Sequence, residues 1–189
     1  MVVSILVCFA FELARRRKAE GGRGKVTSGT KHNMLSQSDG LFRQVAGRVA
    51  EDYPDIDYEN FIVDDFAHRM IARPGELDVV VLPNLYGDIL SDAAAALIGG
   101  LGLAPSGCYG DDYAYFESAH GTAPDIAGRE IINPTATILA AAMLLRYLEF
   151  DRAAASLEQA VTRVYAAGKA LTPDQGGSAS TREFCAAVA

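Results

Sequence analysis

Residues 77–92 read Leu-Asp-Val-Val-Val-Leu-Pro-Asn-Leu-Tyr-Gly-Asp-Ile-Leu-Ser-Asp, and they carry the clearest architectural signal in the chain. The nearly continuous apolar run at 77–82 predicts a strand that is buried on both faces. A helix is predicted to follow, from about Asp88 to Leu97. Ligands of open α/β sheets gather at the carboxyl ends of strands, so the stretch predicts a site where this helix begins.

The alternation of strand and helix extends outward from this stretch in both directions. Before it, we expect elements at 3–18 (helix), 25–27 (strand), 38–52 (helix, capped by Ser38 or Asp39), 58–63 (strand) and 65–72 (helix). After it, we expect a loop-rich segment to 110, a strand at 114–118, a long loop at 120–134, a buried helix at 135–148, an amphipathic helix at 152–167 closed by Gly168, and a last helix from about Ser180. This order of elements predicts the α/β class.

The composition excludes several classes of function. The chain is 50% hydrophobic and has a formal net charge of -7, so it is an ordered globular chain and a poor general binder of nucleic acid. No apolar run is long enough to span a bilayer, and we expect no membrane partner. The three cysteines lie far apart and form neither a zinc pattern nor a disulfide framework. A reducing compartment fits best, either the cytoplasm or, in a eukaryote, the mitochondrial matrix.

Four acidic side chains are candidates for a metal site. Asp88 and Asp92 are four residues apart and share one face of the predicted helix. Two carboxylates that close repel each other unless a cation offsets them, and oxygen ligands suit Mg²⁺ or Mn²⁺. Asp64 and Asp65 follow another apolar strand and offer a third carboxylate. The structural alternative places Asp88 at the helix N-terminus and uses Asp64 or Asp65 as a helix cap, and spacing leaves both open.

Two polar loops carry further candidates. Lys31 follows a short strand, and a desolvated lysine beside a metal can act as a base, although a lone loop lysine is usually a surface charge. The loop from His120 to Gly128 is rich in small residues, which allow a ligand to approach the backbone. The common Gly-x-Gly-x-x-Gly dinucleotide motif is absent. An acid such as Asp125 can accept the ribose hydroxyls of NAD and repel the extra phosphate of NADP, but an ordinary connecting loop explains the pattern equally well.

Taken in order, the motifs resemble the isocitrate/isopropylmalate dehydrogenase family, to which homoisocitrate and tartrate/malate dehydrogenases also belong. The resemblance runs from about Cys8 to the end, and the stretches 87–92 and 120–128 are its most specific parts. It implies the family's α/β fold without its N-terminal part. Residues 1–98 would form the smaller, dimer-forming lobe with part of the active site, and residues 99–189 the C-terminal part of the larger, cofactor-binding lobe. The motifs are Phe11-Glu-Leu-Ala-Arg15, Lys31-His-Asn33, Asp52-Tyr-Pro-Asp55, Val63-Asp64, Asn84–Asp92, Gly99-Gly-Leu-Gly102, His120–Asp125, Ile132-Asn-Pro-Thr135 and Thr172-Pro-Asp174.

The resemblance also implies a role for each matched residue. Lys31 matches the family's catalytic lysine and Asp64 its third metal ligand, and the family contributes both across a dimer. Asp88 and Asp92 match the aspartates that bind Mg²⁺ or Mn²⁺. Asp125 stands where the family's NADP enzymes typically have a lysine, so NAD is favoured. The loop that holds the adenosine half of the cofactor is matched by His120, Gly121, Thr122, Ala123, Asp125 and Asn133.

The implied activity is NAD- and metal-dependent oxidative decarboxylation of a 2-hydroxy dicarboxylic or tricarboxylic acid by a homodimer. Isocitrate is favoured, and isopropylmalate, homoisocitrate and tartrate/malate remain candidates, because the residues that read the substrate would lie upstream of Met1. The family's proton-transferring tyrosine would lie there too, so we expect impaired activity. The alternative is a non-catalytic regulatory subunit or an inactive fragment. His32 departs from the usual alanine, and Asp65 leaves open which aspartate is the ligand.

Overall fold

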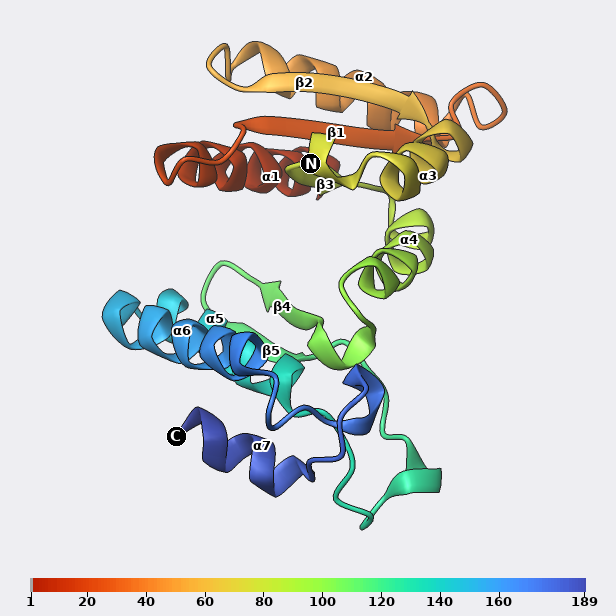
Figure 1. Cartoon of the computed structure of the whole chain (residues 1–189). Coiled ribbons are helices and arrows are strands. Elements are labelled where there is room, and N and C mark those ends of the chain that lie inside the picture. The colour runs from red at the N-terminus through yellow and green to blue at the C-terminus, as the bar shows by residue number, and fades with distance from the viewer. Residues whose placement is uncertain (1) are drawn as a thin grey trace. The chain divides into compact units, whose positions relative to one another are not determined.

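The computed structural model describes residues 2–189, which divide into two compact units (Figure 1). The division falls between Ala94 and Ala95, whereas residues 98 and 99 were the expected boundary. Strands alternate with helices and one sheet is parallel, which confirms the predicted α/β class. Among residues 2–189, no helix has the length and apolar character needed to cross a membrane.

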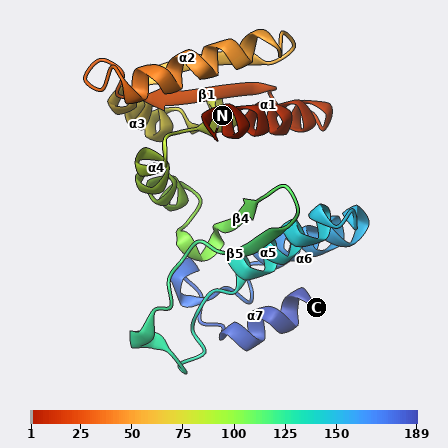
Figure 2. The ribbon, with the colours of Figure 1, turned by 180° about the vertical axis from the view of Figure 1, so that it is seen from behind.

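The first unit is built on a three-stranded parallel sheet in the order β2-β1-β3. Its elements are α1 (Val2–Ala19), β1 (Lys25–Thr30), α2 (Ser38–Glu51), β2 (Asp57–Ile62), α3 (Val63–Ala72), β3 (Val79–Val81) and most of α4 (Asn84–Leu97). The register of β1 and β2 runs from Lys25↔Asp57 to Thr30↔Ile62. As a result, the segments that follow these two strands leave the sheet at the same edge. Figures 1 and 2 show α1 and α2 running alongside the strands.

The core of the first unit lies between α1, α2 and one face of the sheet. Successive strand residues point to opposite faces, so Val26 of β1 faces this core while Gly29 faces α3. A Cβ atom at Gly29 would come within 2.8 Å of the Leu82 side chain and 3.4 Å of Phe66, so glycine permits the close packing on that side. The buried core residues are Val7, Ala10, Phe11, Ala14, Val26, Phe42, Ala46, Val49, Ile56, Val79 and Val81.

Two expectations for residues 77–97 are wrong. The strand is limited to Val79–Val81, and Val80 is 37% exposed, so the strand is not buried on both faces. The reason is that β3 pairs only with β1 among the described residues, while α3 packs on β1 and β2. The helix α4 begins at Asn84, earlier than the expected Asp88.

Asp78 is a buried carboxylate that ties α1 to the sheet. Its side chain is 2% exposed and accepts hydrogen bonds from Arg17 Nε at 2.5 Å and from the Gly24 N–H at 2.9 Å. Burial raises the pKa of Asp78, but Arg17 and the backbone N–H groups lower it by more, so the pKa lies below its ordinary value. The stability contributed by this carboxylate is therefore present above the unfolded pKa of about 3.9 and is lost as the pH falls through the lower folded pKa.

We expect Asp78→Ala to lower the free energy of unfolding by about 2 kcal/mol near neutral pH, because the Gly24 N–H and the Arg17 guanidinium lose their acceptor. The loss is smaller than for a fully buried pair because Arg17 is half-exposed and screened by solvent. Urea unfolding at about pH 7 and about pH 3 measures it. Asp57→Ala removes an exposed acid as the control. An equal loss at both pH values would contradict the assignment.

The second unit is an antiparallel hairpin covered by helices. Its main elements are β4 (Pro105–Tyr109), β5 (Ala114–Ser118), α5 (Thr135–Tyr147), α6 (Asp151–Ala167) and α7 (Thr181–Val188), with short 3-10 helices η2 (Leu101–Leu103), η3 (Pro124–Ile126) and η4 (Pro173–Gln175). The helix α5 packs on both strands, α6 on α5 and α7 on α6. Gly168 ends α6 at a positive φ of 65°, and Ser180 caps α7 in a capping box, which confirms both expected helix boundaries.

Two expectations for the second unit need correction. The segment expected to be loop-rich contains β4. Its Pro, Ser and Gly residues are weak strand formers, and the local sequence does not predict its pairing with β5. The helix α5 was expected to be buried, but Leu144 is 40% and Tyr147 41% exposed. The buried positions of α5 include the small residues Ala136, Ala140 and Ala142, whereas the large apolar residues near its C-terminal end are exposed.

Candidate functional site

Lys31 and Asp64 are brought together by the two central strands of the first unit. Lys31 follows β1, and Asp64 lies in the first turn of α3, directly after β2. The Lys31 ammonium donates to Asp64 Oδ1 at 2.6 Å, and this hydrogen bond lowers the pKa of Asp64. The side chains are 32% and 69% exposed, so the pair is accessible from solvent. A lysine and a carboxylate therefore lie in contact at the carboxyl edge of the sheet.

Asp65 has a different partner from Asp64. It accepts from Arg69 Nε at 2.8 Å, and the Arg69 guanidinium lies 4.2 Å from the centre of the Phe61 ring. The N-cap of α3 is Ile62, without a side-chain capping bond, so the interpretation of either aspartate as a cap is wrong. Asp64 is thus the carboxylate beside Lys31.

Asp39 is a residue whose position the sequence interpretation missed. It was expected to cap α2, but the N-cap is Gln37 and neither Ser38 nor Asp39 caps the helix. Asp39 is only 6% exposed and accepts the backbone N–H of Lys31 at 2.7 Å. The Tyr86 hydroxyl also interacts with Asp39, and burial together with this negative charge raises the pKa of Tyr86. Asp39 therefore fixes the backbone that carries Lys31.

Asp88 and Asp92 lie on an exposed face of α4. The first turn of α4 contains no acid, so the interpretation of Asp88 as a residue at the helix N-terminus is wrong. Asp88 accepts a long hydrogen bond of 3.4 Å from Asn84, and no cation among residues 2–189 forms an ion pair with either aspartate. Two exposed carboxylates with free oxygen atoms on adjacent turns fit a hard divalent cation such as Mg²⁺ or Mn²⁺.

The predicted metal ligands do not form one cluster within this chain. Over the described residues, no three His, Cys, Asp or Glu side chains are grouped around a common metal position. The structure instead gives two pairs in the first unit: Lys31 with Asp64, and Asp88 with Asp92.

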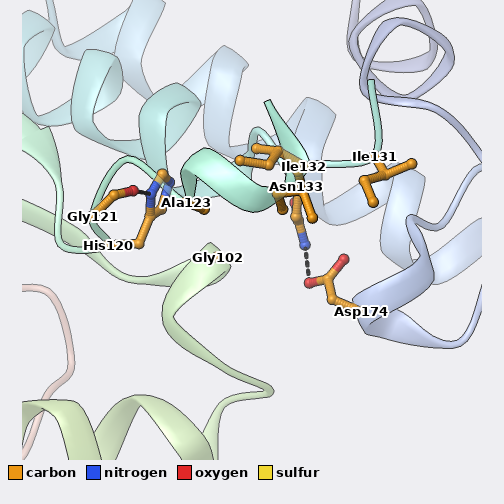
Figure 3. A pocket seen from close by; sticks show the side chains of 9 residues that line it. Gly102, His120, Gly121, Ala123, Ile131, Ile132, Asn133 and Asp174 are labelled. Atoms are coloured by element: carbon orange, nitrogen blue, oxygen red, sulfur yellow. Dashed lines mark hydrogen bonds between the residues drawn. The ribbon is translucent and has the colours of Figure 1, made fainter. Parts of the chain in front are cut away.

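The second unit contains a cavity of about 440 Å³ (Figure 3). Within it, His120 Nδ1 lies 2.9 Å from the Gly121 carbonyl oxygen. Because a carbonyl oxygen only accepts, Nδ1 carries the proton, and a neutral ring leaves Nε2 as an acceptor. Ala123 adopts the left-handed conformation with φ 44°, which a non-glycine residue adopts at some cost. The lining residues are Gly102, His120, Gly121, Ala123, Ile126, Ile131, Ile132, Asn133 and Asp174.

Four of the six residues predicted to hold a cofactor line this cavity: His120, Gly121, Ala123 and Asn133. Thr122 and Asp125 belong to the same segment but not to the lining, and Asp125 is exposed in η3 between Ala123 and Ile126. The sequence interpretation assigned no role to Asp174. The signal for it was the Thr172-Pro-Asp174 motif, which was matched as a motif only.

Asp174 is a negatively charged group held at the cavity wall. It accepts from Thr172 Oγ1 at 2.5 Å, from Asn133 Nδ2 at 2.9 Å and from Gln175 Nε2 at 2.9 Å. Burial raises the pKa of Asp174, but these three hydrogen bonds lower it by more, so the pKa lies below its ordinary value. The cavity therefore presents an ionised carboxylate beside an apolar lining, which suits a ligand with a flat apolar face and hydrogen-bond donors.

The sequence of residues 2–188 matches the family model of isocitrate/isopropylmalate dehydrogenase. The chain therefore belongs to the isocitrate/isopropylmalate dehydrogenase family, whose members are oxidative decarboxylating dehydrogenases. The 3-isopropylmalate/3-methylmalate dehydrogenase of Methanocaldococcus jannaschii is 51% identical over 181 residues, which cover 96% of this chain and 54% of that protein. The probable NAD isocitrate dehydrogenase subunit alpha, mitochondrial, of Caenorhabditis elegans is 48% identical over 95% of this chain and 49% of that protein.

The fold is also similar to solved structures of this family. The crystal structure of isocitrate dehydrogenase from Methylococcus capsulatus superimposes with a TM-score of 0.92 at 42% identity, covering 98% of this chain and 55% of that chain. The chain spans about half the length of the curated relatives it matches. Relatives named for NAD and relatives named for NADP both match.

Proposed function

We propose that the whole protein is an NAD-dependent enzyme that uses Mg²⁺ or Mn²⁺ to decarboxylate a 2-hydroxy dicarboxylic or tricarboxylic acid oxidatively, with isocitrate as the favoured substrate. Isopropylmalate, homoisocitrate and tartrate/malate are the other candidates. The observation that supports this proposal most is that His120, Gly121, Ala123 and Asn133 line one and the same cavity.

In this proposal, the side chains of the first unit handle the metal and the proton. Asp88 and Asp92 hold the cation, and Asp64 completes the site of a second subunit in a homodimer. When bound, the cation polarises the carbonyl of the oxidised substrate and stabilises the charge left by carbon dioxide. Lys31, like Asp64, would act in the site of the second subunit, where its unprotonated amine form would accept the proton of the substrate hydroxyl at Nζ. Asp64 and Asp39 hold the lysine side chain and backbone in place.

The cavity of the second unit holds the adenosine half of NAD in this proposal. Small residues such as Gly121 and Ala123 let the nucleoside approach the backbone. Asp125 disfavours NADP, because a carboxylate repels the 2′-phosphate that distinguishes NADP from NAD. The rival interpretation, a non-catalytic regulatory subunit, is less consistent with the sequence, since Lys31, Asp64, Asp88 and Asp92 are all retained.

NADH formation by the 189-residue chain tests the proposal, with Mn²⁺ and a panel of isocitrate, isopropylmalate, homoisocitrate, malate and tartrate. We expect the folded chain to bind NAD and Mn²⁺ saturably, as measured by calorimetry, and to show impaired turnover. Turnover of one acid would identify the substrate and contradict the expected impairment. A folded chain that binds neither NAD nor Mn²⁺ would contradict the proposed function itself.

A further inference from the structure

Tyr165 of α6 reaches the polar side chains behind the cavity without lining it. Its hydroxyl lies 3.1 Å from Asn133 Nδ2 and 2.8 Å from Thr135 Oγ1. The ring packs edge to face against the fully buried Phe184, with 5.6 Å between ring centroids. The packing of the ring against Phe184 thus places the hydroxyl between Asn133, which precedes α5, and Thr135, the first residue of α5.

The hydrogen bonds around Asn133 fix the orientation of its amide group. Asn133 Oδ1 accepts the Thr135 N–H at 3.0 Å, and Nδ2 donates to the carboxylate of Asp174 at 2.9 Å. The remaining Nδ2 proton points to the Tyr165 hydroxyl oxygen. That oxygen accepts from Asn133. The same hydroxyl shares a hydrogen bond of 2.8 Å with Thr135 Oγ1, in which either oxygen can donate, and it also lies 3.5 Å from Asn133 Oδ1.

This arrangement gives every polar hydrogen of the Asn133 amide a protein partner. Asn133 is 5% exposed and Thr135 1% exposed, so water cannot readily replace a lost partner. Without the hydroxyl of Tyr165, one amide hydrogen is left unsatisfied, and only the hydrogen bonds with Asp174 and with the Thr135 N–H hold the amide in its orientation. The orientation of two cavity-lining side chains therefore depends on a residue outside the cavity.

We infer that Tyr165 is a positioning residue for the nucleotide site: it orients Asn133 and, through Asn133, the Asp174 carboxylate toward an adenosine ligand. The inference rests on the proposed function, in which this cavity binds the adenosine half of NAD. Because Tyr165 does not line the cavity, we expect it to affect the affinity for the adenosine half and not the chemistry.

Calorimetric titration of the 189-residue chain with AMP and with NAD tests the inference. Tyr165→Phe keeps the ring against Phe184 and removes only the hydroxyl. We expect the Kd of both ligands to rise by the same factor, about three- to tenfold, which corresponds to one lost hydrogen bond. Tyr113→Phe is the matched control, because Tyr113 is 80% exposed in the same unit, and its Kd values should equal those of the wild type.

Two further measurements separate positioning from a general loss of stability. Mn²⁺ affinity, which we assign to the first unit, should be the same in the wild type and Tyr165→Phe when titrated well below the melting temperature. Thr135→Val removes the hydroxyl that is hydrogen-bonded to the Tyr165 hydroxyl, and its effect on AMP affinity should be less than additive with Tyr165→Phe. A lower melting temperature with unchanged AMP and NAD affinity would overturn the positioning role alone. A folded wild-type chain that binds neither AMP nor NAD would overturn the proposed function and this inference with it.

Discussion

Asp88→Asn is expected to weaken Mn²⁺ binding by more than about 100-fold, since even the loss of a group that only supports a metal ligand costs roughly 10- to 100-fold. The substitution keeps the shape of the side chain and removes its charge. Asp88 and Asp92 lie on adjacent turns of α4 without a cationic partner in the described chain, so in the proposed function a divalent cation would relieve their repulsion. Titration of Mn²⁺ followed by electron paramagnetic resonance measures the free ion directly.

The control for this experiment is Asp112→Asn, which removes the same charge from an exposed position in the second unit. Its Mn²⁺ affinity should match that of the wild type, because a single distant charge is screened by solvent. Equal Mn²⁺ affinity in Asp88→Asn and Asp112→Asn would show that the two aspartates are only a solvated helix face. The proposed metal site would then be wrong, whatever the result for NAD.

The parts of the fold that the sequence predicted are those with a local signal. The helices that became α1, α2, α5 and α6 carry long apolar or amphipathic patterns, and Gly168 and Ser180 mark boundaries by their own backbone chemistry. The strand β4 has no such signal, because it exists through its pairing with β5. The exposure of Val80 depends on which faces of the sheet other elements cover, and a run of valines cannot reveal that.

In the candidate site, too, sequence motifs predicted some residues, whereas the roles of others depend on tertiary contacts. The resemblance supplied the cofactor loop, and four of its six residues line one cavity. Asp39 and Tyr165 were missed because their roles arise from tertiary contacts: one accepts the Lys31 N–H, and the other satisfies the Asn133 amide. Neither role follows from spacing, since an acid at the start of a helix usually suggests a cap and a tyrosine in an amphipathic helix suggests packing.

Charge at position 125 is expected to decide which nucleotide the cavity prefers. Asp125 is exposed in η3, between the lining residues Ala123 and Ile126. Asp125→Lys replaces a negative with a positive charge beside the expected position of the ribose. A phosphate carries most of two charges, and such charges near a protein surface interact by about one to a few kcal/mol. The ratio of NADP to NAD affinity should therefore rise by about 10- to 100-fold.

Titration with adenosine 2′,5′-bisphosphate and with AMP isolates this effect, because the two ligands differ only in the 2′-phosphate. Asp125→Lys should tighten binding of the bisphosphate and leave the affinity for AMP within a few-fold of the wild type, since the adenine contacts and the Asp174 carboxylate are unchanged. Asp111→Lys makes the same charge reversal at an exposed position of the same unit and accounts for the change in net charge. If both variants raise the affinity for the bisphosphate equally, the effect is long-range steering by net charge, and Asp125 does not read the ribose. If only Asp125→Lys does so, the preference for NAD is encoded by one carboxylate in the loop between β5 and α5.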